Sequence, residues 1–349
     1  MRLDYEKGAS MKIGVVLMNT GTADEPTVPA IRSYLYEFLM DPAIIPAPAF
    51  IRKHIVNHIL AKRPQSTLPR YEEFWTPQGS PFTIACGKQA QRLEVELSGR
   101  LPEDVRVAVG QRYGNPSVLD ALHELRVWGA DRVVILPAYP QQVKACTGTC
   151  LARAREVLAS MAQRYGWRPQ VVEAGSFYLN DNWRRAVARQ VARSWAWQPG
   201  SKLVVSFHST LVKDIEAGDP YKTQCEETAA NLASDLGIPA GDVVLCYQSR
   251  FDNRKWLQPL APAVLEKLAA QGVRDVAVVC PGFVAENMET ALDVGRDLRR
   301  CYMEAAGREA SFTYVPCLNS DAGLIKALAD TVVEALEAAP GLPEAAGEE

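Results

Sequence analysis

The sequence predicts an α/β protein of two similar Rossmann-like lobes, each a four-stranded parallel sheet flanked by helices, with a cleft between them. Three observations predict this fold. Short, nearly continuous apolar runs alternate with longer amphipathic stretches, as in parallel sheets that helices cover on both faces. Eight such runs divide into two groups of four near residues 175–180. Two stretches, 129–140 and 272–283, repeat one pattern: a glycine, a buried strand and a loop containing proline.

The strands and helices can be assigned in order along the chain. The strands of the first lobe are expected at 12–18, 105–110, 132–137 and 170–173, and those of the second at 202–207, 243–247, 275–280 and 311–315. Amphipathic helices are expected between them, for example at 117–127, 151–164, 182–195 and 259–271. Because strand–helix–strand alternation gives parallel sheets, each group forms one sheet. We assign 11–177 to the first lobe, 178–320 to the second, and 321–338 to a helix that crosses back to the first lobe.

Composition and charge exclude several classes of protein. The 349 residues carry a formal net charge of −3 without a block of Lys and Arg, which argues against nucleic acid as a partner. Eight cysteines without a CxxC pair fit a reducing compartment. No apolar run is long enough to span a bilayer and no signal peptide is evident, so we expect a cytoplasmic protein. Residues 1–10 and 339–349 are expected to be a disordered leader and tail.

The loops after the strands are where a ligand is expected, because open α/β sheets bind ligands outside the carboxyl ends of their strands. Neither GxGxxG nor GxxxxGK[ST] occurs, so dinucleotide or P-loop chemistry has no support. Six loops hold most of the unusual polar residues, and they are 19–26, 111–116, 139–149, 208–221, 248–256 and 282–289.

The four histidines differ in their positions. His208 follows a buried strand and leads into a polar loop, where a base or a metal ligand would lie. His54 and His58 have a spacing that brings two imidazoles onto one helix face, but without HExxH a surface amphipathic helix is favoured. His123 lies in the middle of a helix and is interpreted as a surface or half-buried residue.

Two pairs of residues have spacings that allow joint chemistry. Glu286 and Glu289 are three apart at the start of a helix, which predicts two carboxylates on one face, with simple complementation of the helix dipole as the alternative. Cys146 and Cys150 are four apart near another helix start; two free thiols are favoured over a metal pair.

A series of short segments, considered together, is characteristic of one family. The segments are NTGTADEPT from residue 19, KRPQST from 62, GSPF from 79, QRYGNP from 111, SFHS from 206, GDPYKTQCEET from 218, YQSRF from 247, CPGF from 280 and ENMET from 286. From about residue 12 to residue 338 the sequence resembles the ferrochelatase family. The resemblance implies a lyase that inserts Fe²⁺ into protoporphyrin IX, giving protohaem and two protons.

The resemblance also implies roles for individual residues. His208 is the proton acceptor and metal ligand, Glu289 assists it, and Glu286 is a second acidic group for proton exit or metal entry. The residues implied to line the porphyrin pocket are Thr20, Arg63, Ser80, Arg112, Tyr113, Tyr139 and Trp256, with the two arginines facing the propionates. Fe²⁺ is then a substrate, and no permanently bound cofactor is implied. Because Cys317 is the last cysteine of the sequence, no iron–sulfur cluster is expected.

Departures from the family pattern leave alternatives open. Thr20 replaces an apolar or tyrosyl residue, and Thr210 replaces the usual Leu after the SFHS segment. Coproporphyrin III or another tetrapyrrole therefore stays an alternative substrate, and a non-catalytic porphyrin or haem carrier is an alternative of another class. Residues 44–60 are interpreted as an apolar lip over the cleft, with contact to a membrane surface as a second reading. The oligomeric state is left open.

Overall fold

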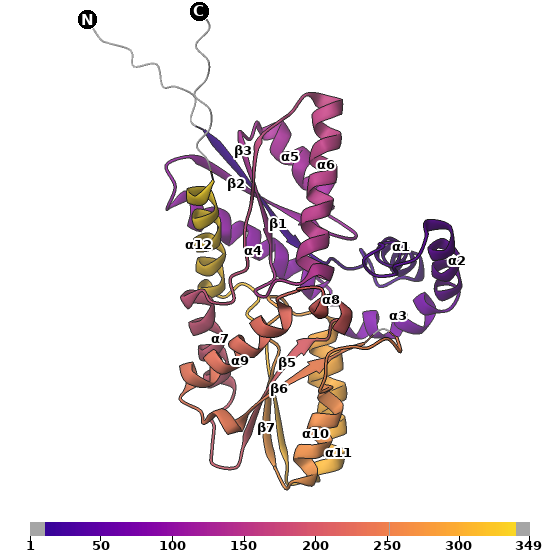
Figure 1. The fold of residues 1–349 in the computed structure, drawn as a ribbon, viewed down its shortest axis with the longest axis vertical. Helices are drawn as coiled ribbons and strands as arrows, with labels where there is room; N and C mark the ends of the chain where they lie inside the picture. The colour runs from indigo at the N-terminus through magenta and orange to yellow at the C-terminus, as the bar shows by residue number, and fades with distance from the viewer. Residues whose placement is uncertain (1–10, 251, 340–349) are drawn as a thin grey trace, which may run out of the picture.

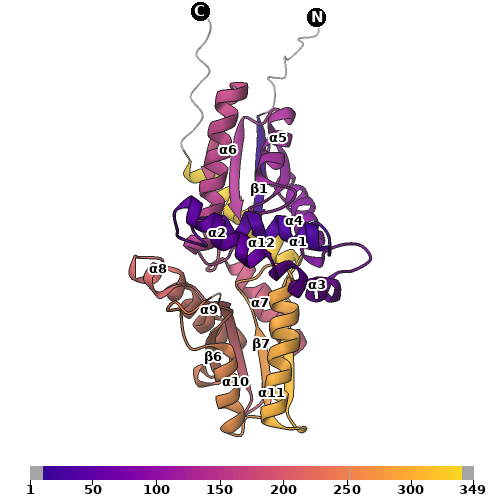
Figure 2. The same cartoon turned by 90° about the vertical axis from the view of Figure 1, so that its right-hand side faces the viewer.

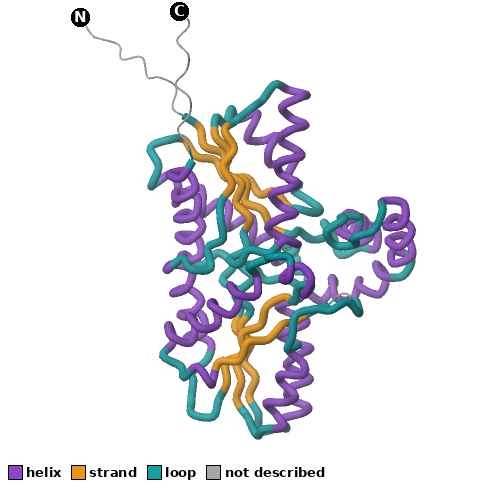
Figure 3. Tube along the Cα trace, viewed as in Figure 1, coloured by secondary structure: helices purple, strands orange, loops and turns teal. Residues whose placement is uncertain are grey.

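The computed structural model describes residues 11–250 and 252–339, so the leader 1–10, residue 251 and the tail beyond 339 lie outside the described residues. Two α/β lobes are stacked along the long axis, and a helical arm projects from the side of the first lobe (Figures 1 and 2). Figure 3 shows a separate bundle of strands in each lobe, with loops gathered between the two bundles.

The two sheets have the same topology. The first has the order β2-β1-β3-β4 and the second β6-β5-β7-β8, and all neighbouring strands are parallel. The predicted fold class and all eight predicted strands are therefore confirmed. The strands are β1 (Lys12–Asn19), β2 (Asp104–Gln111), β3 (Arg132–Pro137), β4 (Gln170–Glu173), β5 (Lys202–His208), β6 (Val243–Gln248), β7 (Asp275–Val279) and β8 (Ser311–Val315).

The repeated sequence pattern has a structural counterpart. The two stretches that share it form β3 and β7, and these are inner strands of their sheets, paired with the inner strands β1 and β5. The central strands β1 and β5 are buried along nearly their whole length, which explains their unbroken apolar runs.

Helices cover both faces of each sheet, and alternate strand residues point to opposite faces. In the first lobe Val16 and Met18 pack under α5 and α6, whereas Val15 and Leu17 belong to a core with α4 and α12. In the second lobe α10 and α11 cover one face, and α7 and α9 the other. These helices are α4 (Pro81–Ser98), α5 (Val118–Trp128), α6 (Thr149–Tyr165), α7 (Asp181–Ser194), α9 (Tyr221–Leu236), α10 (Ala261–Ala270), α11 (Arg299–Ala306) and α12 (Ala322–Ala338).

One hydrophobic core connects the two lobes. It includes Leu17 of the first sheet, Val205 of the second and Leu328 of α12. Helix α12 packs against α4 and α7, and its Asp330 accepts hydrogen bonds from Arg100 Nη1 at 2.6 Å and Asn182 Nδ2 at 2.8 Å. The last helix thus links an element of the first lobe to one of the second.

The arm consists of α1 (Val28–Leu39), α2 (Ala49–Leu60) and α3 (Arg63–Phe74). It stands away from both sheets (Figure 1), and its helices pack mainly on one another. Helix α2 buries Arg52, whose Nη1 donates to the carbonyl oxygen of Ile45 at 3.2 Å, and leaves Phe50 and Ile51 exposed. His54, His58 and the distant His123 are exposed, as expected for surface helices. None of the described helices is long and apolar enough to cross a membrane.

Candidate active site

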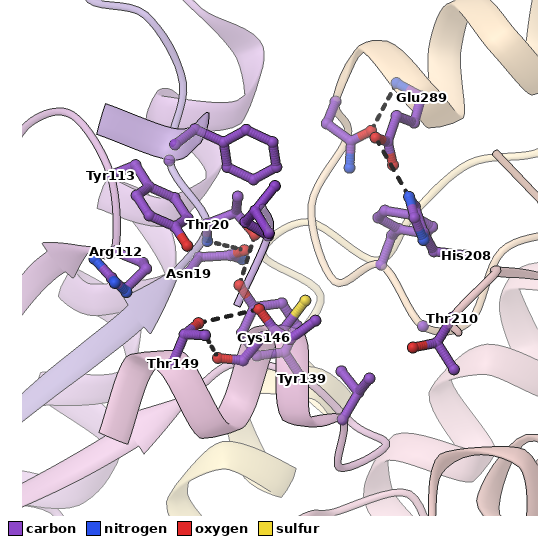
Figure 4. Close-up of a pocket in the computed structure, with 18 of the residues that line it drawn as sticks. Asn19, Thr20, Arg112, Tyr113, Tyr139, Cys146, Thr149, His208, Thr210 and Glu289 are labelled. Atoms are coloured by element: carbon purple, nitrogen blue, oxygen red, sulfur yellow. Dashed lines mark hydrogen bonds and ion pairs between the residues drawn. The ribbon is translucent and has the colours of Figure 1, made fainter. Parts of the chain in front are cut away.

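A cavity of about 250 Å³ lies at the carboxyl ends of the strands, with residues of both lobes and of the arm in its walls. All six loops expected to hold a ligand contribute to it. Figure 4 shows His208 and Glu289 on one side of this cavity, and Thr20, Tyr139 and Cys146 on the other.

His208 is the last residue of the central strand β5, and its surroundings fix the imidazole. Nδ1 lies 2.6 Å from the carbonyl oxygen of Ser209, so a neutral ring that donates from Nδ1 carries its lone pair on Nε2. The backbone is held in turn, because the carbonyl oxygen of His208 accepts from Tyr221 Oη at 3.0 Å and Ser209 N donates to Gln248 O at 2.8 Å. The basic nitrogen is therefore presented on the side of Glu289.

Glu289 is the first residue of a π-helix, η3 (Glu289–Leu298), and Oε1 lies 3.9 Å from His208 Nε2. Its backbone N donates to Asn287 Oδ1 at 2.8 Å, and Thr290 N donates to the same oxygen at 3.1 Å. Asn287 thus satisfies two of the donors that a helix start leaves open. Imidazole and carboxylate together form a base with a neighbouring acceptor, and both are suitable ligands for Fe²⁺ or Zn²⁺.

Glu286 does not share a helix face with Glu289, and this corrects the expectation drawn from their spacing. The helix begins only at Glu289, which leaves Glu286 in the preceding loop with its carboxylate turned away from the cavity. There it accepts from Tyr314 Oη at 2.9 Å, Thr290 Oγ1 at 2.7 Å and Cys317 N at 2.8 Å. These bonds join the start of η3 to the end of β8.

The opposite wall carries hydroxyl and thiol groups. Thr20 Oγ1 and Tyr139 Oη are 2.6 Å apart. Burial raises the pKa of Tyr139 well above its ordinary value, and burial together with the nearby charge of Glu289 raises the pKa of Cys146 to about 12. These groups therefore stay protonated near neutral pH. Cys150 is buried and does not line the cavity, and within 11–250 and 252–339 no three His, Cys, Asp or Glu side chains are arranged to hold a metal ion.

Arg112 and Tyr113 line the cavity but are held by a carboxylate from the arm. Arg112 forms an ion pair with Asp41, and Tyr113 Oη donates to Asp41 Oδ2 at 2.8 Å. The guanidinium also lies 4.4 Å from the centroid of the Tyr113 ring. Gly21 makes this arrangement possible: its φ is +97°, and a Cβ there would lie 1.8 Å from the carbonyl oxygen of Tyr113.

Three of the sequence-predicted site residues do not line the cavity. Arg63 is exposed at the start of α3, Ser80 is buried at the start of α4, and Glu286 is turned away as described. The seven that the structure brings together are Thr20, Arg112, Tyr113, Tyr139, His208, Trp256 and Glu289.

Sequence comparison agrees with this site. The model of the ferrochelatase family matches residues 12–336. Ferrochelatase of Thioalkalivibrio sulfidiphilus is 36% identical over 98% of this chain and 91% of its own length. Ferrochelatase of Herminiimonas arsenicoxydans is 37% identical over 93% of this chain and 87% of its own.

The chain belongs to the ferrochelatase family. This confirms the resemblance drawn from the ordered segments, and membership supports an enzyme that inserts a metal ion into a porphyrin.

Solved structures support the fold of this ferrochelatase family member. The sirohydrochlorin chelatase of Bacillus subtilis subspecies spizizenii, in complex with cobalt, superposes with a TM-score of 0.53 at 10% identity, covering 94% of this chain and 96% of its own. A multi-domain protein of Deinococcus radiodurans with similarity to chelatases gives a TM-score of 0.54 at 11% identity, covering 94% of this chain and 56% of its own.

Sequence reasoning missed the aromatic lining that the arm and α4 give this ferrochelatase family member. The side chains are Tyr34, Phe38, Tyr71, Phe74 and Phe82. In the sequence these residues are marked only by being aromatic and lying on helices. That pattern indicates an ordinary hydrophobic core at least as often as a ligand site. Asp41 and Arg254 were also missed, because their significance depends on loops that fold back to the cavity.

Carboxylates continue along η3 beyond Glu289. Asp293 and Asp297 follow at intervals of four, and Arg70 of α3 forms ion pairs with both. Burial raises the pKa of Asp293, although the charge of Arg70 opposes this. The arm of this ferrochelatase family member is thus tied to the second lobe at the helix that carries Glu289.

Proposed function

We propose that the protein is a ferrochelatase that inserts Fe²⁺ into protoporphyrin IX, with His208 as the proton acceptor. The observation that carries the proposal is the pair His208–Glu289, 3.9 Å apart on one wall of a cavity that aromatic side chains line. Aromatic and apolar surfaces suit a flat macrocycle, and family membership supports porphyrin as the substrate class.

The chemistry requires a base and a metal ligand at one place. Two N–H bonds of the porphyrin break, four nitrogen–iron bonds form, and two protons leave. Imidazole is the side chain that changes charge nearest to neutral pH, so a neutral His208 can take a pyrrole proton through Nε2. Glu289 would stabilise the imidazolium and offer an oxygen to the incoming ion. A positioned base contributes about 10²–10⁴-fold to the rate.

The test is an anaerobic insertion assay that offers Fe²⁺ with protoporphyrin IX and with coproporphyrin III in parallel, followed by the loss of free-base porphyrin absorbance. We expect faster turnover of protoporphyrin IX. Faster turnover of coproporphyrin III would replace the substrate and keep the chemistry. Tight porphyrin binding without insertion of Fe²⁺, Zn²⁺ or Co²⁺ would instead favour a carrier.

We also propose that the arm contacts a membrane surface. Phe50 is 77% exposed on α2, Ile51 and Ile55 of the same helix are also exposed, and the exposed Lys53 supplies positive charge. In sedimentation with vesicles of anionic lipid at low salt, Phe50→Asp should lower the bound fraction. Val95→Asp, at an equally exposed residue on α4, should not. Absence of binding by the unaltered protein would contradict the proposal.

A further inference from the structure

Among the described residues, two arginines supply the positive charge in the cavity wall, Arg112 and Arg254. The two guanidinium groups differ in how many of their N–H groups remain available to a ligand. Arg112 is already paired with Asp41, whose side chain is 5% exposed, and Arg63, expected from the sequence to face a substrate carboxylate, lies off the wall. Arg254 is therefore the cavity cation with the greater capacity to take a new partner.

Arg254 lies in the loop that follows β6, and one edge of its guanidinium is fixed within that loop. Nε donates to Asp252 Oδ2 at 2.6 Å, and the backbone N of Arg254 donates to Asp252 Oδ1 at 2.9 Å. The indole Nε1 of Trp256 donates to the same Oδ1 at 3.1 Å. One carboxylate thus orients a cation and a neighbouring aromatic ring together.

The other end of the guanidinium remains available. Within 11–250 and 252–339 neither Nη atom of Arg254 donates a hydrogen bond, and the side chain is 34% exposed. Four N–H groups at this end can hold a carboxylate through two parallel bonds, the geometry in which arginine exceeds lysine. The guanidinium carbon lies 5.8 Å from the centroid of the Trp256 ring, so a cation and a flat apolar surface are adjacent in the wall.

We propose that Arg254 is a substrate-binding residue that recognises a carboxylate on the edge of the porphyrin, while the indole of Trp256 contacts the macrocycle beside it. The proposal rests on the proposed function, because it assigns a site for one chemical group of that substrate. A porphyrin with propionate side chains has an apolar face and an anionic edge. The apolar face matches the indole of Trp256, and the anionic edge matches the guanidinium of Arg254.

Binding of free-base protoporphyrin IX and of its dimethyl ester, followed by fluorescence, tests the assignment. Arg254→Ala should weaken binding of the diacid about tenfold, as expected for one charge-assisted pair, and change binding of the ester less than about twofold. Arg254→Lys should recover part of the lost affinity. Lys255→Ala is the matched control, since it removes the same charge from the adjacent exposed residue, which does not line the cavity.

The outcomes separate this assignment from the proposed function. Equal affinity of the unaltered protein and Arg254→Ala for the diacid would overturn the assignment alone. Equal losses for diacid and ester would also overturn it, because they would indicate that Arg254 only supports the loop. If the unaltered protein bound neither compound, the proposed function would be contradicted, and the assignment with it.

Discussion

At the scale of single residues, the candidate site depends on side chains fixed by their own neighbours in sequence. Ser209 sets the tautomer of His208, and Asn287 holds the backbone of Glu289. Such local bonds hold an imidazole and a carboxylate in a fixed arrangement, and a preformed arrangement of side chains is how a catalytic site lowers the cost of orientation.

Cys146 should react slowly with alkylating reagents although it lines the cavity. The reactive species is the thiolate, and burial raises the pKa of this thiol to about 12, so little thiolate exists at pH 8. Labelling with iodoacetamide, followed by peptide mass spectrometry, should be far slower than for a free cysteine and should rise with pH. A rate at pH 8 equal to that of free cysteine would contradict this account.

Asp41 should contribute more to stability than its place in a loop suggests. Replacing it by Ala leaves the largely buried guanidinium of Arg112 without its ion pair, and breaking a fully buried pair costs about 3–5 kcal/mol, which is the upper bound here. Denaturant unfolding of Asp41→Ala should show a loss in the free energy of unfolding of about 2–4 kcal/mol. The double variant Asp41→Ala with Arg112→Leu should recover part of the lost stability. A loss below about 1 kcal/mol in the single variant would exclude the ion pair as a major contribution to the free energy of unfolding.

The sequence predicted some site residues and missed others for a physical reason. His208 ends β5 and Glu289 lies in the segment after β7, and the carboxyl ends of these two paired strands meet at one edge of the sheet. Topology therefore indicates that both residues lie near that edge. Asp41 and Arg254 approach the cavity through the arm and through an irregular loop, which no periodicity describes. Arg63 failed to reach the wall because α3 begins there and directs its side chain outward.

At the scale of elements, the helix that carries Glu289 departs from α-helical geometry. The sequence indicated a helix start, but it predicted neither the π-helical form of η3 nor the point at which it begins. That point separates Glu286 from Glu289 and gives the two carboxylates different neighbours. π-helical turns are rare and occur often at functional sites.

Arg70 should restrain η3 against local opening. It bridges α3 to Asp293 and Asp297, so Arg70→Ala leaves the arm without this link to the second lobe. Hydrogen exchange should become faster in α3 and η3 and remain unchanged in α5, which packs on β1, β2 and α6 of the first lobe. Arg185→Ala, which removes an exposed ion pair on α7, is the control. Unchanged exchange in both α3 and η3 would contradict the restraint.

At the scale of the whole molecule, the two sheets share one continuous core through α12. The two repeated stretches indicated that the lobes are alike, and the sequence predicted that the last helix crosses back to the first lobe. The sequence did not predict which residues form the shared core, because that core joins residues about 300 positions apart, such as Leu17 and Leu328. Periodicity describes each element, but it does not say which elements meet.

The shared core predicts that the lobes unfold together. Denaturant unfolding followed by far-ultraviolet circular dichroism and by tryptophan fluorescence should give coincident transitions, because Trp183 of α7 is buried in the same core as Leu17 and Leu328. Two separated transitions would indicate that each lobe is stable alone.

The central claim is that His208 carries the proton transfer of metal insertion, and its most direct test is the kcat of Fe²⁺ insertion in His208→Ala. We predict a fall of about 10²–10⁴-fold, with unchanged thermal unfolding and retained porphyrin binding. A kcat within about twofold of the unaltered enzyme would contradict the account, because the imidazole at the end of β5 would then not be the base.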